Sequence, residues 1–177
     1  MKRAVSRIFC LQSLAALAAT LVLFTAQSAF SKEFPRPTGA VVLTVTGLID
    51  KKNGDGAALL DEGMLLRLPQ HRIETRTPWT DGIARFDGVL LRDLLAAVGA
   101  SGDTLFAEAI NGYRIAFPLS DADEFGVLLA MRLDGKRLSR RDKGPLWIVY
   151  PRDSIAEVRD ERYDSRWVWQ LNRLEVR

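Results

Sequence analysis

Short apolar runs separated by turn residues extend through most of the chain. Runs rich in β-branched and aromatic residues predict strands over 41–49, 71–76, 104–110, 113–117, 128–133, 136–138, 146–150 and 167–176. Apolar residues at helical spacing predict helices over 59–68 and 89–98. Ser120 followed by Asp123 is typical of the first turn of a further short helix. Many short strands with a few helices predict a mixed α+β domain.

Turn residues define several connections between these elements. Asn111-Gly112 lies between two strand-like runs and predicts a hairpin. Gly99 follows the predicted helix 89–98, as expected for a left-handed residue after a helix end. Residues 86–88 (Phe-Asp-Gly) are interpreted as a turn before that helix. The densely charged stretch 152–166 is interpreted as a solvated loop, with a partner surface as the alternative.

The N-terminus has the pattern of a secretory signal peptide. Residues 1–7 are basic, residues 8–24 are apolar, and small residues follow, with Ser28 as a candidate cleavage position. An uncleaved membrane anchor is the alternative. No twin-arginine pair precedes the apolar run, so Sec-type export in the unfolded state is expected. We predict a signal peptide over 1–31 and a single domain over 32–177.

Charge and residue content exclude several classes of function. The net charge of +3 equals the basic excess of residues 1–31, so the remainder is neutral and gives no electrostatic case for nucleic-acid binding. Cys10, the only cysteine, lies in the predicted signal peptide, so the exported chain is expected to have no thiol. His71, the only histidine, cannot form a multi-histidine metal site. Function is therefore expected to depend on pocket shape and hydrogen bonding.

Five segments occur in the order found in one protein family. They are 86–99 (FDGVLLRDLLAAVG), 111–113 (NGY), 128–135 (LLAMRLDG), 144–151 (GPLWIVYP) and the closing strand 167–176. Together they resemble the sulfite-oxidase-type molybdopterin-binding domain over nearly all of 41–177. The resemblance implies the sulfite-oxidase-like (SUOX) fold, with mixed β-sheets and a few short helices.

The chain departs from this family at the metal ligand. The resemblance implies a cysteine thiolate that holds molybdenum, between the strand and the turn before the helix. Here that stretch, residues 73–79, reads IETRTPW. A threonine hydroxyl is neutral and hard where molybdenum needs a soft, charged sulfur. A molybdenum cofactor and sulfite oxidation are therefore not expected.

Short, cysteine-free, exported chains of this kind resemble small periplasmic pterin-binding regulators. This resemblance implies a non-catalytic periplasmic protein that binds a free, metal-free pterin. It also implies a partner, the periplasmic domain of a membrane sensor with cyclic-di-GMP synthase or phosphodiesterase domains, and hence control of biofilm formation or attachment. Two alternatives stay open. One is a molybdopterin-dependent oxidoreductase without the cysteine ligand, and the other is an interaction module without a ligand.

A pterin needs an aromatic face for stacking, a carboxylate for its amino and N3 donors, and cations or amides for its 4-oxo group. In the loop where the family has its metal ligand, Trp79 is the expected stacking partner and Asp81 the expected carboxylate. The alternative is that Trp79 anchors the loop in the core and Asp81 forms a turn with Gly82. Trp167 and Trp169 are interpreted as core aromatics on a sheet face, with stacking as the alternative. The candidate ligand-binding residues are Thr75, Arg76, Thr77, Trp79, Asp81, Asn111, Tyr113, Arg141, Asp142 and Lys143.

Overall fold

The computed structural model describes residues 34–177, so the predicted signal peptide lies outside the described residues. Strands predominate among the elements, and the few helices are short. In chain order the elements are β1 (Val41–Gly47), β2 (Ala58–Asp61), α2 (Glu62–Leu66), β3 (Gln70–Arg76), β4 (Ile83–Leu90), α3 (Leu91–Val98), β5 (Thr104–Ala109), β6 (Arg114–Pro118), α4 (Asp121–Glu124), β7 (Leu128–Leu133), β8 (Lys136–Arg137), β9 (Trp147–Val149), the 3₁₀ turns η1 (Glu157–Arg159) and η2 (Glu161–Arg166), and β10 (Leu171–Val176). Among these residues no helix is long and apolar enough to cross a membrane.

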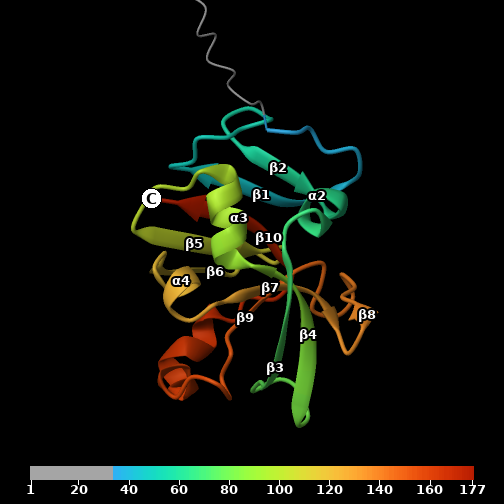
Figure 1. Cartoon of the computed structure of the whole chain (residues 1–177), viewed down its shortest axis with the longest axis vertical. Helices are drawn as coiled ribbons and strands as arrows, with labels where there is room; N and C mark the ends of the chain where they lie inside the picture. Colours follow the sequence, from blue (N-terminus) through green and yellow to red (C-terminus); the bar gives the residue numbers. More distant parts are fainter. Residues whose placement is uncertain (1–33) are drawn as a thin grey trace, which may run out of the picture. The chain divides into compact units, whose positions relative to one another are not determined.

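The strands form two sheets. The first has the order β2-β1-β10-β5-β6, in which β1 and β10 run parallel and the other neighbours are antiparallel. The second has the order β3-β4-β7-β8, and β9 pairs with β7. Figure 1 shows the first sheet in the upper half and the β3–β4 hairpin reaching down beside the segment that contains η1 and η2. The hairpin and this segment thus form the lower part of the domain.

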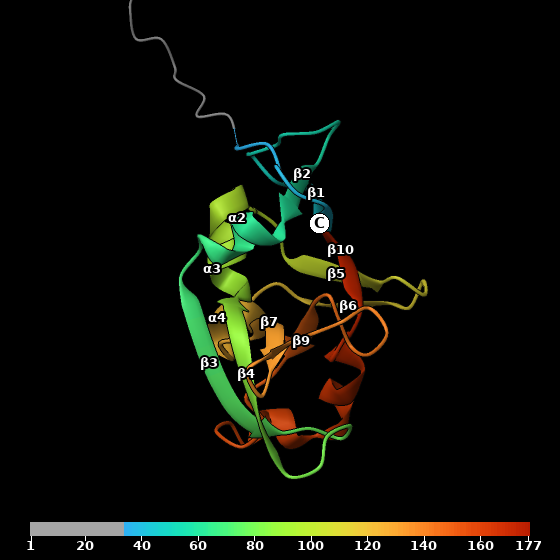
Figure 2. The same ribbon diagram turned by 90° about the vertical axis from the view of Figure 1, so that its right-hand side faces the viewer.

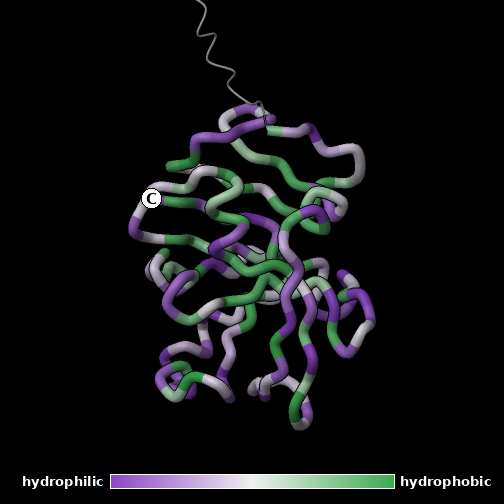
Figure 3. Tube along the Cα trace, in the orientation of Figure 1, coloured by the Kyte–Doolittle hydropathy of each residue, from purple (hydrophilic) through white to green (hydrophobic). Residues whose placement is uncertain are grey.

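The core lies along the first sheet and continues into β7 and β9. Figures 1 and 2 show α3 against one face of the first sheet, and its Leu91, Leu94 and Leu95 are buried there. The helix ends at Gly99, whose φ of 66° is the left-handed conformation that glycine adopts without strain. Figure 3 shows hydrophobic residues along the central strands, with polar ones more frequent in the lower loops. A continuous apolar core therefore supports both sheets.

The helix predicted over 59–68 is instead a strand followed by a short helix. Residues 58–60 pair with β1, and Asp61 ends the strand. The Asp61 carboxylate accepts hydrogen bonds of 2.7 Å from the backbone N–H groups of Met64, Thr38 and Gly39. These bonds hold the pKa of Asp61 below its usual range, and the bond from Gly39 has the largest effect. One carboxylate thus caps α2 and fixes the entering chain.

The predicted turn at residues 86–88 is also different, because β4 continues through it. A Cβ on Gly88 would lie 2.1 Å from the carbonyl oxygen of Leu129 on the neighbouring β7. Glycine here therefore permits a close approach of two strands rather than a turn. The pairing register of β4 and β7 shifts between Asp87 and Gly88, and the helix begins only at Leu91.

The stretch predicted as a solvated loop, 152–166, is attached to the core. Tyr163 is buried, and Arg166 donates a hydrogen bond of 2.5 Å to the buried Asp121 carboxylate. The Tyr150 hydroxyl donates to the same oxygen at 2.7 Å. Burial, with Asp121 beside it, raises the pKa of Tyr150. This buried network fixes the end of η2 in place.

Candidate functional site

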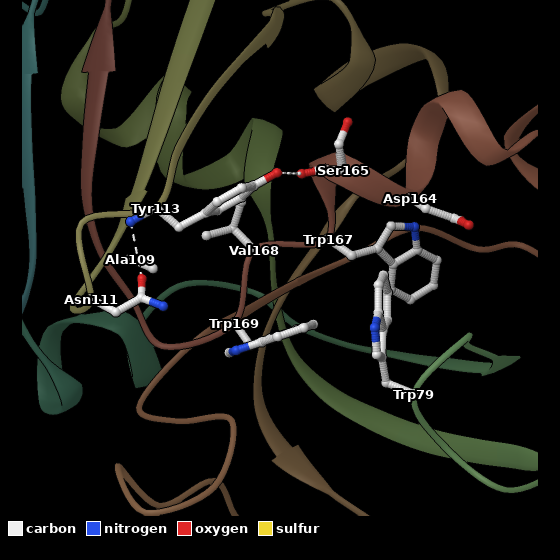
Figure 4. A pocket seen from close by; sticks show the side chains of 9 residues that line it. All are labelled: Trp79, Ala109, Asn111, Tyr113, Asp164, Ser165, Trp167, Val168 and Trp169. Atoms are coloured by element: carbon white, nitrogen blue, oxygen red, sulfur yellow. Dashed lines mark hydrogen bonds between the residues drawn. The ribbon is translucent and has the colours of Figure 1, made fainter.

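A cavity of about 360 Å³ lies between the β5–β6 hairpin, the loop after β3, and η2 with the chain that follows it. Figure 4 shows the side chains that line it. Three of the four tryptophans of the chain are among them. The lining residues are Trp79, Ala109, Asn111, Tyr113, Asp164, Ser165, Trp167, Val168 and Trp169. An apolar, concave cavity of this size with a few polar groups is typical of a small-molecule site.

Trp79 belongs to a cluster of four tryptophans. Its ring centroid is 5.1 Å from that of Trp169, 5.9 Å from that of Trp167 and 6.5 Å from that of Trp147. The interplanar angles of 55–73° are those of tilted and edge-to-face contacts. Trp79 and Trp169 are half-buried, whereas Trp147 is fully buried. The half-buried rings of Trp79 and Trp169 therefore expose part of their indole surface to the cavity and pack on the buried Trp147.

The three candidate residues just before Trp79 position its loop and do not line the cavity. The Thr77 hydroxyl accepts a 3.0 Å hydrogen bond from the backbone N–H of Trp79 and lies 2.9 Å from the Thr80 hydroxyl. The buried Thr75 hydroxyl accepts from the N–H of Asp153 at 3.1 Å. Arg76 binds the Asp153 carboxylate through its N–H at 2.9 Å and its guanidinium at 3.2 Å. These bonds join the end of β3 to the chain before η1.

Asn111 and Tyr113 line the cavity from the tip of the β5–β6 hairpin. The Tyr113 hydroxyl donates a 2.9 Å hydrogen bond to the carbonyl oxygen of Ser165. The Asn111 side-chain oxygen accepts from the Tyr113 N–H at 3.0 Å. Figure 4 shows both bonds on the side of the cavity opposite Trp79. The hairpin tip therefore forms a second wall.

The remaining four candidate residues lie outside the lining. Asp81 is exposed in the loop after Trp79, and Arg141 is exposed in the loop before β9. The Asp142 carbonyl accepts a 3.0 Å hydrogen bond from the side chain of Gln170, the residue after Trp169. The Lys143 ammonium lies 3.4 Å from the Asp142 carboxylate and 5.5 Å from the ring centroid of Trp147. Through its contacts with Gln170 and Trp147, this loop supports residues beside the cavity without lining it.

Six lining residues were not among the candidates, namely Ala109, Asp164, Ser165, Trp167, Val168 and Trp169. β10 begins only at Leu171, so both tryptophans precede the strand and an isolated bridge pairs Trp169 with Trp147. The two tryptophans alternate around one residue in the sequence, and this pattern was the signal by which they could have been recognised as lining residues. For Asp164 the signal was absent, because its place depends on the 2.5 Å contact of its carboxylate with Arg152.

The donor set near Trp79 does not fit molybdenum. Residues 34–177 contain no cysteine, and no group of three or more His, Cys, Asp or Glu side chains among them is arranged to hold a metal ion. The hydroxyls of Thr75 and Thr77 engage protein groups, and a neutral hydroxyl does not replace a thiolate on a soft metal. No step through molybdenum is derived for this cavity.

Comparison with known proteins identifies the family. The model described as the oxidoreductase molybdopterin-binding domain matches residues 66–158. Among curated proteins no match is found. Among solved structures, the sulfane dehydrogenase SoxCD from Paracoccus pantotrophus has a similar fold, with a TM-score of 0.57 and 23% identity. The match covers 76% of this chain and 37% of that one, so this chain spans little more than a third of its length. The chain belongs to the oxidoreductase molybdopterin-binding domain family and has its sulfite-oxidase-like fold.

Proposed function

We propose that this domain binds a free pterin, without a metal, in the cavity beside Trp79. The observation that carries the proposal is the convergence of Trp79, Trp167 and Trp169 on one cavity of about 360 Å³ in a fold whose family binds a pterin-containing cofactor. Aromatic stacking contributes about 0.5–1.5 kcal/mol beyond the burial of apolar area. Several indole faces around a flat ring therefore provide most of the affinity.

Polar groups at the margin of the cavity set the orientation of the ring. Asn111 supplies an amide, which both donates and accepts hydrogen bonds. Asp164 supplies a carboxylate beside Trp167, and it replaces the exposed Asp81 as the expected partner for the amino and N3 donors of a pterin. Few polar groups in an apolar cavity give specificity without a large desolvation penalty.

The proposed role is binding and not catalysis. Residues 34–177 contain no cysteine that could supply the thiolate ligand of the family, and the threonines in the corresponding stretch hold the loop of Trp79. The predicted signal peptide supports a periplasmic location, where a free pterin is captured after export. On this proposal, pterin binding is relayed to the periplasmic domain of a membrane sensor that controls cyclic-di-GMP. The exposed Ile110 and Tyr113 beside the cavity are available for such a contact.

Calorimetric titration of the purified protein with oxidised and tetrahydro forms of neopterin tests the proposal. We expect saturable binding at a stoichiometry of one, and a loss of at least about tenfold in affinity in Trp169→Ala. Leu48→Ala is the control, because Leu48 is exposed on the chain after β1 and does not line the cavity. Absence of binding of both forms would overturn the proposal.

The relay is tested separately, by co-purification of the protein with the periplasmic domain of a candidate sensor. We expect neopterin to change the amount recovered. Ile110→Asp is expected to abolish recovery while leaving the neopterin affinity within about twofold, since Ile110 lies beside the cavity and outside its lining. Equal recovery with and without neopterin would refute a ligand-dependent relay.

A further inference from the structure

We propose that this cavity selects uncharged pterins and rejects pterins that carry a phosphate, which includes molybdopterin itself. This inference rests on the proposed function and narrows it to one class of ligand. It follows from the mismatch between a phosphate-bearing cofactor and the charges that surround the cavity.

Among residues 34–177, those that line the cavity include no lysine or arginine. The lining residues that have polar side chains are Asn111, Tyr113, Asp164 and Ser165. Phosphate sites in proteins are normally built from arginine or lysine side chains or from backbone N–H groups at the start of a helix. The remaining lining residues are hydrophobic, so the cavity presents no fixed positive charge to a ligand.

Two arginines that are close to lining residues are held by other groups. The Arg152 guanidinium is 2.5 Å from the Asp164 carboxylate through one terminal nitrogen, and its other terminal nitrogen donates to the Arg159 carbonyl at 2.9 Å. Arg166 is bound to the buried Asp121 carboxylate at 2.5 Å. Asp164 therefore keeps the Arg152 guanidinium engaged and away from the ligand.

The candidate cations predicted from the sequence are occupied or remote as well. Arg76 pairs with Asp153, Lys143 pairs with Asp142, and Arg141 is exposed outside the lining. None of the three lines the cavity. An anionic substituent would therefore lose hydration on entry without gaining an ion pair.

Desolvation decides between the two kinds of ligand. A neutral pterin exchanges water for indole faces and keeps its polar edge at the margin of the cavity. A phosphate that enters an indole-walled cavity gives up strong hydration, and an unpaired buried charge is strongly unfavourable. The matching ligand is an uncharged pterin with a neutral substituent.

The experiment compares neopterin with neopterin monophosphate on the wild type and on three variants, by quenching of tryptophan fluorescence. Ser165→Lys places a cation on the lining, at an exposed residue whose side chain makes only a 3.5 Å contact with the Arg162 carbonyl. Asp164→Asn removes the partner of Arg152. Glu161→Gln is the matched control, because it removes the same charge from the same 3₁₀ turn at an exposed residue outside the lining.

We expect the wild type to bind neopterin at least about tenfold more tightly than its monophosphate. Relative to the affinity for neopterin, the affinity for the monophosphate should rise by about tenfold in Ser165→Lys and in Asp164→Asn, although Asp164→Asn weakens binding of both because it removes the partner of the amino and N3 donors. Glu161→Gln should leave this ratio within about twofold. Equal or tighter binding of the monophosphate by the wild type would overturn the selectivity and leave pterin binding intact. Failure of the wild type to bind either compound would overturn both proposals.

Discussion

The Tyr113 hydroxyl donates a hydrogen bond of 2.9 Å to the carbonyl of Ser165, 52 residues further along the chain. Tyr113 belongs to the β5–β6 hairpin, and Ser165 belongs to η2. Both residues line the cavity beside Trp79. This bond therefore joins two walls of the cavity that are formed by separate parts of the sequence.

Removal of this bond is expected to weaken binding more than folding. Tyr113→Phe keeps the ring and removes one exposed hydrogen bond, so the affinity for neopterin should fall by about two- to tenfold. The melting temperature of the free protein should stay within about two degrees, because the bond is near the surface. Titration and a thermal melt of the same sample measure both effects. An unchanged affinity would show that the hairpin tip is not fixed by this bond.

Trp79 is expected to serve both stability and binding. Its half-buried indole contacts three other tryptophans, so Trp79→Ala should lower the free energy of unfolding by about 1–3 kcal/mol. The affinity for neopterin should fall at least about tenfold. Trp79→Phe should retain most of the stability, as measured by denaturant unfolding. Full stability in Trp79→Ala would show that the cluster does not depend on this side chain.

The buried contact between Arg166 and Asp121 is expected to hold η2 on the core. Arg166→Met leaves Asp121, which is 3% exposed, with Tyr150 as its remaining hydrogen-bond donor. Loss of one partner of a buried pair costs about 3–5 kcal/mol of stability. Arg162→Met is the control, since Arg162 pairs with Asp160 at the surface and should change stability little. Equal stability of the two variants would contradict the account of η2.

Asp61 gives the stability a defined dependence on acid pH. Its pKa in the folded protein is lower than the value of about 3.9 expected for an unfolded chain. Its contribution is therefore complete above that unfolded value and is lost as the pH falls through the folded pKa. Asp61→Asn should be less stable at pH 7 and should lose less stability between pH 5 and pH 3.

The control for this pH dependence is Asp55→Asn, because Asp55 is exposed in the turn before β2. Denaturant unfolding of the wild type and both variants over the pH series measures the difference. If the stability of Asp61→Asn falls with pH as steeply as that of the wild type, carboxylates other than Asp61 determine the acid sensitivity.

Much of the fold was predictable because its signals are local. Alternating and β-branched runs predicted β1, β3, β5, β6, β7 and β9, and Asn111-Gly112 predicted the β5–β6 hairpin. Two errors have a tertiary cause. Gly88 permits the close approach of β7, and residues 58–60 pair with β1 although their apolar spacing also suits a helix. Neither pairing can be recognised within a short window of sequence.

The site was predictable only in part for the same reason. Trp79, Asn111 and Tyr113 carry local signals, and the structure brings them to one cavity. Asp164 and Ser165 reach it because Arg166 and Tyr163 attach η2 to the core. The charge pattern of 152–166 does not reveal these contacts, since buried and exposed charges look alike in sequence.

Quenching of the intrinsic tryptophan fluorescence by neopterin tests the central proposal most directly, because three of the four tryptophans line the cavity. The account predicts a saturable loss of most of the emission at one equivalent of neopterin, in protein from which metals have been removed. Trp169→Ala should need a much higher concentration of neopterin to reach the same effect. Linear, unsaturable quenching that is identical in the wild type and Trp169→Ala would contradict pterin binding at this site.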